Sequence, residues 1–143
     1  MLPEISEIEA KAKEWQPIMR ISDWEIVVSY VDQYRMKDLS GDDDCIAYCW
    51  TQRKRKFAHI YFNQDDDDNE KNWQGNLVHE MYHVVSDDLA YQIEVILAFV
   101  PEDQRKALRE TYITYIERLV DDLAKGFITI QKGDPNALQI TDY

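Results

Sequence analysis

Apolar side chains recur every three to four positions in four stretches of the chain, which is the spacing of one face of an α-helix. The predicted helices cover residues 3–15, 72–86, 89–99 and 101–125. Pro17 is expected to end or bend the first helix, and Pro101 to begin the last one. Gly126 is expected to stop that last helix, because glycine is common just after a helix C-terminus. Residues 127–143 are then predicted to form a C-terminal tail.

Three shorter stretches are rich in β-branched and aromatic residues and predict strands over residues 22–31, 45–51 and 57–62. The basic run 53–56 is expected to be the solvated tip of a hairpin between the last two strands, and the polar segment 32–44 a loop. These elements predict an α+β fold. A small, mostly antiparallel three-stranded sheet would pack on the helix over 72–86 and on the long last helix. The whole chain, residues 1–143, is expected to be one domain, with its N-terminal helix inside residues 1–19.

The formal net charge of −12 argues against partners that carry phosphate groups, because nucleic acids and anionic membrane surfaces would be repelled. The longest apolar run, residues 95–100, is too short to span a bilayer. The first seven residues are acidic and lack the apolar centre of a signal peptide. A cytoplasmic protein is therefore expected.

Two cysteines, Cys45 and Cys49, agree with that compartment. On a strand, residues four apart lie about 13 Å from each other, which is too far for a disulfide. Reduced, partly buried thiols are expected.

The acidic run 63–70 does not fit a calcium loop of the EF-hand type, because no register supplies both the glycine and the glutamate of that motif. Asp68 or Asn69 is expected instead to cap the following helix, whose positive end favours acidic groups.

The sequence His79-Glu80-Met81-Tyr82-His83 is the most specific chemical pattern in the chain. Histidines four residues apart lie on one face of a helix, so both imidazoles can reach one metal ion. A glutamate after the first histidine is placed to act as a general base, as in metalloproteases with the HExxH motif. His79 and His83 are therefore candidate zinc ligands, and Glu80 is the candidate base.

A catalytic zinc site needs a third protein ligand. The downstream candidates are Glu94, Glu102, Glu110 and Glu117. Glu117 is at the edge of the apolar face of the last predicted helix, and Glu110 lies on nearly the same side two turns earlier. The helical pattern alone leaves Glu117, Glu110 and Glu94 open.

The motif within residues 76–85, combined with Glu117 in the segment 117–124, resembles the small zincin-like metallopeptidases of the gluzincin type encoded by bacteriophages and prophages. The predicted strands over 24–28 and 58–62 stand in the same order before the motif helix. A looser likeness is to the zinc peptidase-like domains that cleave or inactivate phage repressors in bacteria. The resemblance covers residues 20–125. It implies a zincin-like fold, zinc bound by His79, His83 and Glu117, Glu80 as base, and the host cytoplasm if a phage encodes the protein.

The leading hypothesis is a zinc-dependent peptide hydrolase with a peptide or protein substrate. The strand over residues 58–62 is expected to offer a free edge on which an extended peptide can lie. His59, on that strand, is expected to be structural rather than to face the cleft.

The rival hypothesis is a non-catalytic zinc-binding or pseudo-peptidase domain that acts by binding another protein in phage biology. Substituting Glu80 distinguishes the two, because only an enzyme needs its base.

Overall fold

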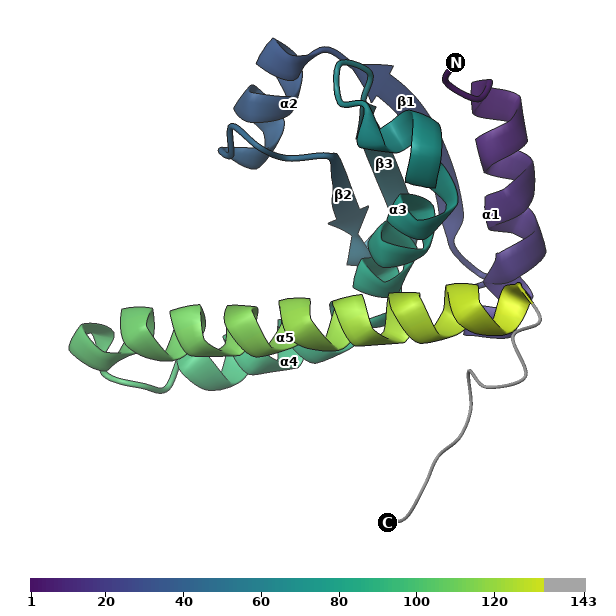
Figure 1. The fold of residues 1–143 in the computed structure, drawn as a ribbon. Coiled ribbons are helices and arrows are strands. Elements are labelled where there is room, and N and C mark those ends of the chain that lie inside the picture. The colour runs from purple at the N-terminus through teal and green to yellow at the C-terminus, as the bar shows by residue number, and fades with distance from the viewer. Residues whose placement is uncertain (133–143) are drawn as a thin grey trace.

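The computed structural model describes residues 1–132, which form five α-helices, a short 3-10 helix and one three-stranded sheet (Figure 1). The helices are α1 (Ile5–Met19), α2 (Gln33–Ser40), α3 (Asp68–Val85), α4 (Asp87–Leu97) and α5 (Glu102–Gln131). The strands are β1 (Glu25–Val31), β2 (Ala47–Gln52) and β3 (Phe57–Asn63), and the 3-10 helix is Arg53–Arg55. The expected α+β class is confirmed. None of the helices in residues 1–132 is both long enough and apolar enough to cross a membrane.

The sheet is mixed rather than mostly antiparallel, because its strand order is β1-β3-β2. β2 and β3 form the expected antiparallel hairpin, with Trp50 opposite His59. β1 pairs with the other side of β3 in parallel, with Val27 opposite His59. The expectation that β3 offers a free edge is therefore wrong: β3 is the central strand, and β1 and β2 are the edges.

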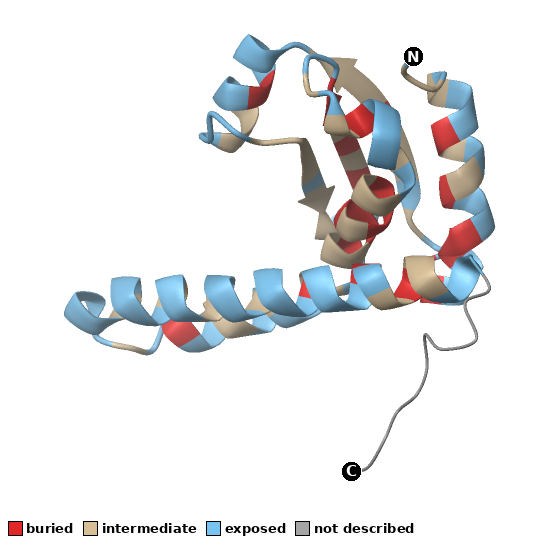
Figure 2. Cartoon of the chain, in the orientation of Figure 1, coloured by how far each residue is buried: buried red, intermediate tan, exposed pale blue. Residues whose placement is uncertain are grey.

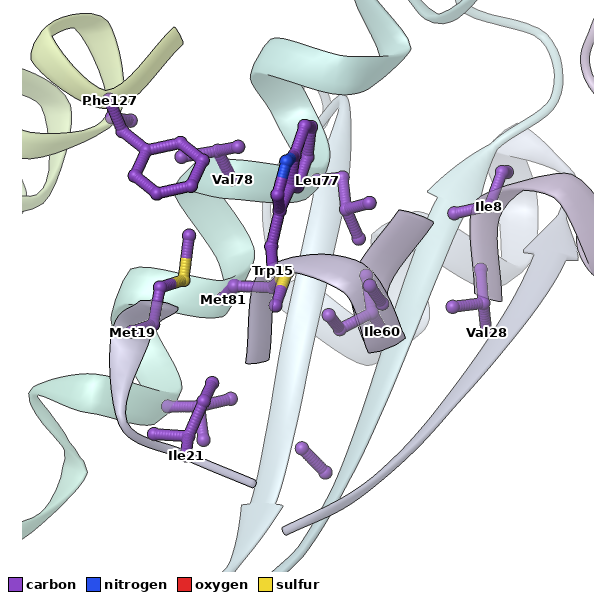
Figure 3. Close-up of a cluster of buried hydrophobic side chains, with 14 of the residues drawn as sticks. Ile8, Trp15, Met19, Ile21, Val28, Ile60, Leu77, Val78, Met81 and Phe127 are labelled. Atoms are coloured by element: carbon purple, nitrogen blue, oxygen red, sulfur yellow. The ribbon is translucent and has the colours of Figure 1, made fainter. Parts of the chain in front are cut away.

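One face of the sheet carries the hydrophobic core. Ala58, Ile60 and Phe62 alternate along β3 and are fully buried, because side chains two apart on a strand point to the same face. α1 and α3 cover this face, and Figure 3 shows Trp15 of α1 among the α3 side chains Leu77 and Met81. Figure 2 shows the buried residues concentrated in β3, α3 and the inner side of α1.

The segment 32–44 is not a plain loop, because it contains α2. Asp32 caps this helix by accepting a hydrogen bond from the Arg35 backbone N–H at 2.8 Å. Gly41 ends it in the left-handed conformation (φ 74°). Met36 anchors the helix, with no exposed surface. Asp32 and Gly41 are both recognisable in the sequence as helix-capping residues, but the segment between them is too polar to show the apolar spacing of a helix.

The last helix does not stop at Gly126 but continues to Gln131, so the predicted tail over 127–143 is wrong for its first five residues. Residues 133–143 lie outside the described part of the chain. Phe127 explains the continuation, because it is buried against Trp15 and Tyr82 with ring centroids 5.4 and 6.2 Å apart. Glycine inside a helix costs about 1 kcal/mol relative to alanine, which is less than the gain from burying a phenylalanine.

Two further boundaries differ from the sequence prediction. α1 continues past Pro17 to Met19, so the helix does not end at this proline. α3 begins at Asp68 and kinks at Asn72, with Asp67 rather than Asp68 or Asn69 at its N-cap position and no side-chain cap bond. Asn69 is instead buried and donates hydrogen bonds to the carbonyl oxygens of Ile46 and Asn63.

Candidate metal centre

The two motif histidines lie on one side of α3, one turn apart, with ring centroids 5.1 Å from each other. The opposite side of this helix is fixed in the core by Leu77, Val78 and Met81, all with no exposed surface. Each histidine side chain keeps 25% of its surface exposed. Core packing therefore turns both imidazoles toward the groove between α3 and α5.

Glu117 of α5 meets both histidines. Its two carboxylate oxygens lie 3.5 Å from His79 Nε2 and 3.1 Å from His83 Nε2. One ligand atom from each of the three residues can be chosen so that all lie within 4.8 Å of one another. A tetrahedral ion with metal–ligand distances of about 2.1 Å holds its ligand atoms about 3.4 Å apart, so small adjustments of these side chains would let one ion contact all three. Two imidazoles and a carboxylate also form a donor set that zinc accepts.

The charges in this group favour an ionised carboxylate. Contacts with the imidazoles of His79 and His83 hold the pKa of Glu117 well below its usual range. The same contact with Glu117 raises the pKa of His79, although partial burial opposes it. The two imidazoles and the carboxylate are thus already drawn together, and a cation bound between them would replace the direct contacts between nitrogen and oxygen atoms.

Asp121 is a site residue that the sequence prediction missed. Its Oδ1 lies 3.0 Å from His79 Nδ1, on the side of the ring away from Glu117. A carboxylate in this position fixes the tautomer and the orientation of a metal-binding imidazole. The sequence does contain a signal for Asp121: it follows Glu117 by four residues, and residues four apart on a helix face the same side.

Glu80 differs from the three candidate ligands because it is almost completely buried, with 6% of its surface exposed. Burial raises the pKa of its carboxyl group, while the neighbouring imidazoles of His83 and His79 oppose the rise. It lines the same cleft as His79, His83 and Glu117. A carboxylate held in this way is suited to taking up and releasing a proton.

The cleft has a volume of about 600 Å³ and runs between α3 and the edge strand β2. β2 contributes Ala47, Tyr48, Cys49 and Thr51 to its wall. β2 therefore takes the position expected of the strand over 58–62, since it is the edge strand that borders the histidines. The Thr51 hydroxyl group donates a hydrogen bond of 2.6 Å to the carboxylate of Asp87 at the start of α4. This bond links β2 to the helical side of the cleft.

His59 lies away from this cleft. Its Nε2 is 2.8 Å from the Ser29 hydroxyl oxygen, and its ring stacks on Tyr61 at a centroid distance of 4.0 Å. Ala58 and Ile60 on either side of it point into the core and direct His59 to the opposite face of the sheet, so it does not face the cleft.

The other candidate ligands have different positions. Glu94 pairs with Arg109 through two contacts of 3.0 Å and accepts a hydrogen bond from the Tyr112 hydroxyl group. Glu110 is exposed and lies about 10 Å along α5 from Glu117, two turns toward the N-terminus. Glu102 is exposed at the start of the helix.

The two cysteines are free and partly buried, as expected. Both line the cleft, and burial raises the pKa of the Cys49 thiol well above its usual range. A thiol in this condition is a poor nucleophile.

Comparison with known proteins gives no matching family model, no matching curated protein and no matching solved structure. The chemistry of the site is therefore inferred from its own residues.

Proposed function

We propose that this chain is a zinc-dependent peptide hydrolase of the zincin-like type. The observation that carries the proposal is the convergence of His79, His83 and Glu117 on one point beside the buried carboxylate of Glu80. The helix pattern supplies two ligands and a base, and a separate helix supplies the third ligand. Three protein ligands with one open side is the arrangement of catalytic zinc rather than structural zinc, which is more often closed by cysteines.

Zinc bound there would act as a Lewis acid that polarises a peptide carbonyl and makes water acidic enough to react near neutral pH. Glu80 is the group that accepts the proton from the attacking water. The same carboxyl group then donates the proton to the leaving amine. Its raised pKa supports the first role, because a more basic carboxylate is a better proton acceptor.

The edge of β2 provides a place for the substrate backbone. A strand with one unpaired side can accept an extended peptide through main-chain hydrogen bonds, which give affinity without demanding a particular sequence. Ala47, Tyr48 and Cys49 on this strand border the cleft that contains the histidines. A bound peptide would therefore lie across the metal position with a carbonyl group near Glu80.

Zinc content tests the metal site directly. The protein is reconstituted with zinc, dialysed and analysed by mass spectrometry of the metal. One zinc per chain is expected for the unaltered protein, and a loss of nearly all of it for His79→Ala. His59→Ala is the matched control, because it removes the histidine that lies outside the cleft and should leave the zinc content unchanged. Equal zinc in His79→Ala and the unaltered protein would refute the site.

Glu80→Gln separates the enzyme from a non-catalytic zinc-binding module. This variant keeps the size of the side chain, so it should retain zinc and fold normally. Cleavage of an unstructured protein such as casein, or of a peptide library, should fall by at least about a hundredfold, because loss of a general base removes that much of the rate. Zinc binding without cleavage by the unaltered protein would favour the binding module.

A further inference from the structure

We propose that one end of the cleft binds a lysine or arginine side chain of the substrate, and that Asp87 pairs with its positive charge. This end, the Asp87 recess, is lined by Thr51, Ser86, Asp87, Ala90 and Ile116. Its role depends on the proposed function, because the basic side chain belongs to the peptide that lies along β2. The substrate class is therefore a peptide with a basic residue next to the cleaved bond.

The cleft and the hollow that adjoins it at Asp44 are lined by acidic side chains and by no lysine or arginine. The carboxylates are Asp42, Asp44, Glu80, Asp87, Glu117 and Asp121. A third hollow, between α3 and α5, adds a single basic residue, Lys125. A doubly charged zinc ion and this lysine offset three of the six negative charges, so the site as a whole stays negative. It therefore attracts a basic side chain and repels an acidic one.

Basic residues near the cleft are already paired with acids that lie outside it. Lys37 lies 2.9 Å from Asp43, and Arg53 lies 3.5 Å from Asp88. Neither Asp43 nor Asp88 lines the cleft. Asp87 does line it, and it has no ion pair with a lysine or arginine in residues 1–132. Its charge is therefore left for a ligand.

Helix geometry places Asp87 one turn beyond the metal centre. Ser86, Asp87 and Ala90 follow His83 by three, four and seven residues, which is the spacing of one helix face. The backbone at Ser86, between α3 and α4, stays in the right-handed helical region (φ −85°, ψ 0°) and so continues that face. At 1.5 Å per residue, Asp87 is about 6 Å along the chain from His83, close to the length of a lysine side chain.

The Asp87 recess suits both parts of a basic side chain. Ala90 and Ile116 are half-buried and supply apolar surface for the methylene stem, and the small side chain of Ser86 leaves room for it. The Thr51 hydroxyl group donates a hydrogen bond to Oδ1 of Asp87 and so fixes the carboxylate. Oδ2 is left to accept a hydrogen bond from an ammonium or guanidinium group, and charge-assisted bonds of this kind are strong.

Glu80 is a second sign that the cleft receives a polar ligand. Its carboxylate is 6% exposed and lines the cleft, and it has no hydrogen bond or ion pair with another group in residues 1–132. Buried polar groups are nearly always paired, because leaving one unpaired costs free energy. An unpaired carboxylate that faces the cleft is therefore placed to meet a bound molecule.

Peptide binding, followed by fluorescence anisotropy, tests the Asp87 recess. The full chain is loaded with zinc and carries Glu80→Gln, so that a bound peptide is not cut. The probes are a fluorescein-labelled peptide of alanine and serine with one central lysine, and matched peptides with glutamine or glutamate in its place. The lysine peptide should bind at least about tenfold more tightly than the glutamine peptide, and the glutamate peptide most weakly.

Adding Asp87→Asn should remove the preference for lysine. Asparagine keeps the size of the side chain and can still accept the Thr51 hydrogen bond, but it carries no charge. Asp88→Asn is the matched control, because Asp88 is the next residue of the same helix, is exposed and does not line the cleft. It should keep the preference. Circular dichroism and zinc content show whether each variant is folded and loaded.

A lysine preference that Asp87→Asn abolishes and Asp88→Asn retains supports the recess. Equal binding of the three peptides overturns it, as does the absence of binding, and so does an equal loss of preference in the two variants. Cleavage of the lysine peptide by the zinc-loaded unaltered protein is measured separately. A lysine preference in binding without any cleavage would refute the hydrolase and still support a site for basic side chains.

Discussion

The buried side chain of Phe127 allows a direct test of how the C-terminal end of α5 is attached to the core. This side chain is 7% exposed and lies against Trp15 of α1 and Tyr82 of α3, with ring centroids 5.4 and 6.2 Å away. It fastens the C-terminal end of α5 to the core that also carries the motif helix (Figure 3). If α5 ended at Gly126, Phe127→Ala would have almost no effect.

Deleting a buried phenylalanine side chain costs about 3–5 kcal/mol, through lost burial and the cavity left behind. A domain of this size is stable by about 5–15 kcal/mol in total, so the change is large. At about 2–4 °C per kcal/mol, the melting temperature should fall by about 10 °C. Glu117 lies ten residues toward the N-terminus on the same helix, about 15 Å away, so loosening this end should also weaken zinc binding.

Thermal unfolding followed by circular dichroism, with and without zinc, measures both effects. Phe99→Ala is the control, because it deletes the same atoms from a side chain that is 88% exposed and should change stability by less than about 0.5 kcal/mol. Equal melting temperatures for the two variants would refute the packing of α5 described above.

Two further predictions concern carboxylates on α4 and α5. Asp121→Asn should weaken zinc binding about 10–100-fold in a chelator competition, because His79 loses the carboxylate that orients its ring. Its exposed neighbour gives the control variant Asp122→Asn, which should bind zinc normally; equal affinities would show that Asp121 does not orient the ring. The hydrogen bond from Arg109 lowers the pKa of Glu94. The ion pair therefore contributes its full stability at pH values above the ordinary glutamate pKa, and this contribution is lost as the pH falls through the lowered pKa of Glu94. Glu94→Gln should therefore be slightly less stable than the unaltered protein in urea at pH 7, by less than about 1 kcal/mol for so exposed a pair, and equally stable at pH 2. A difference that persists at pH 2 would contradict this assignment.

Local patterns in the sequence predicted much of the fold. The 3.6-residue spacing located α1, α3, α4 and most of α5, and the β-branched runs located the three strands. The motif histidines and Glu80 were placed correctly on one helix, because residues four apart share a face in any α-helix. These features depend only on neighbours along the chain, so they can be read without the tertiary structure.

Three features depended on contacts between distant residues and were missed. The parallel pairing of β1 made β3 central and left β2 as the edge beside the site. Phe127 carried α5 past Gly126, because its partner Trp15 lies more than a hundred residues earlier in the chain. Asp121 reached His79 only because α5 packs against α3.

The chain itself therefore determines that the two motif histidines lie on one face of a helix beside Glu80, since a regular helix presents them together wherever it packs. Which glutamate completes the group is decided by the way α5 crosses α3, which brings Glu117 within 3.1 Å of His83 and leaves Glu94 bound to Arg109. The physical reason is that helix geometry is set by the local backbone, whereas the crossing of two helices is set by the side chains that each buries against the rest of the fold.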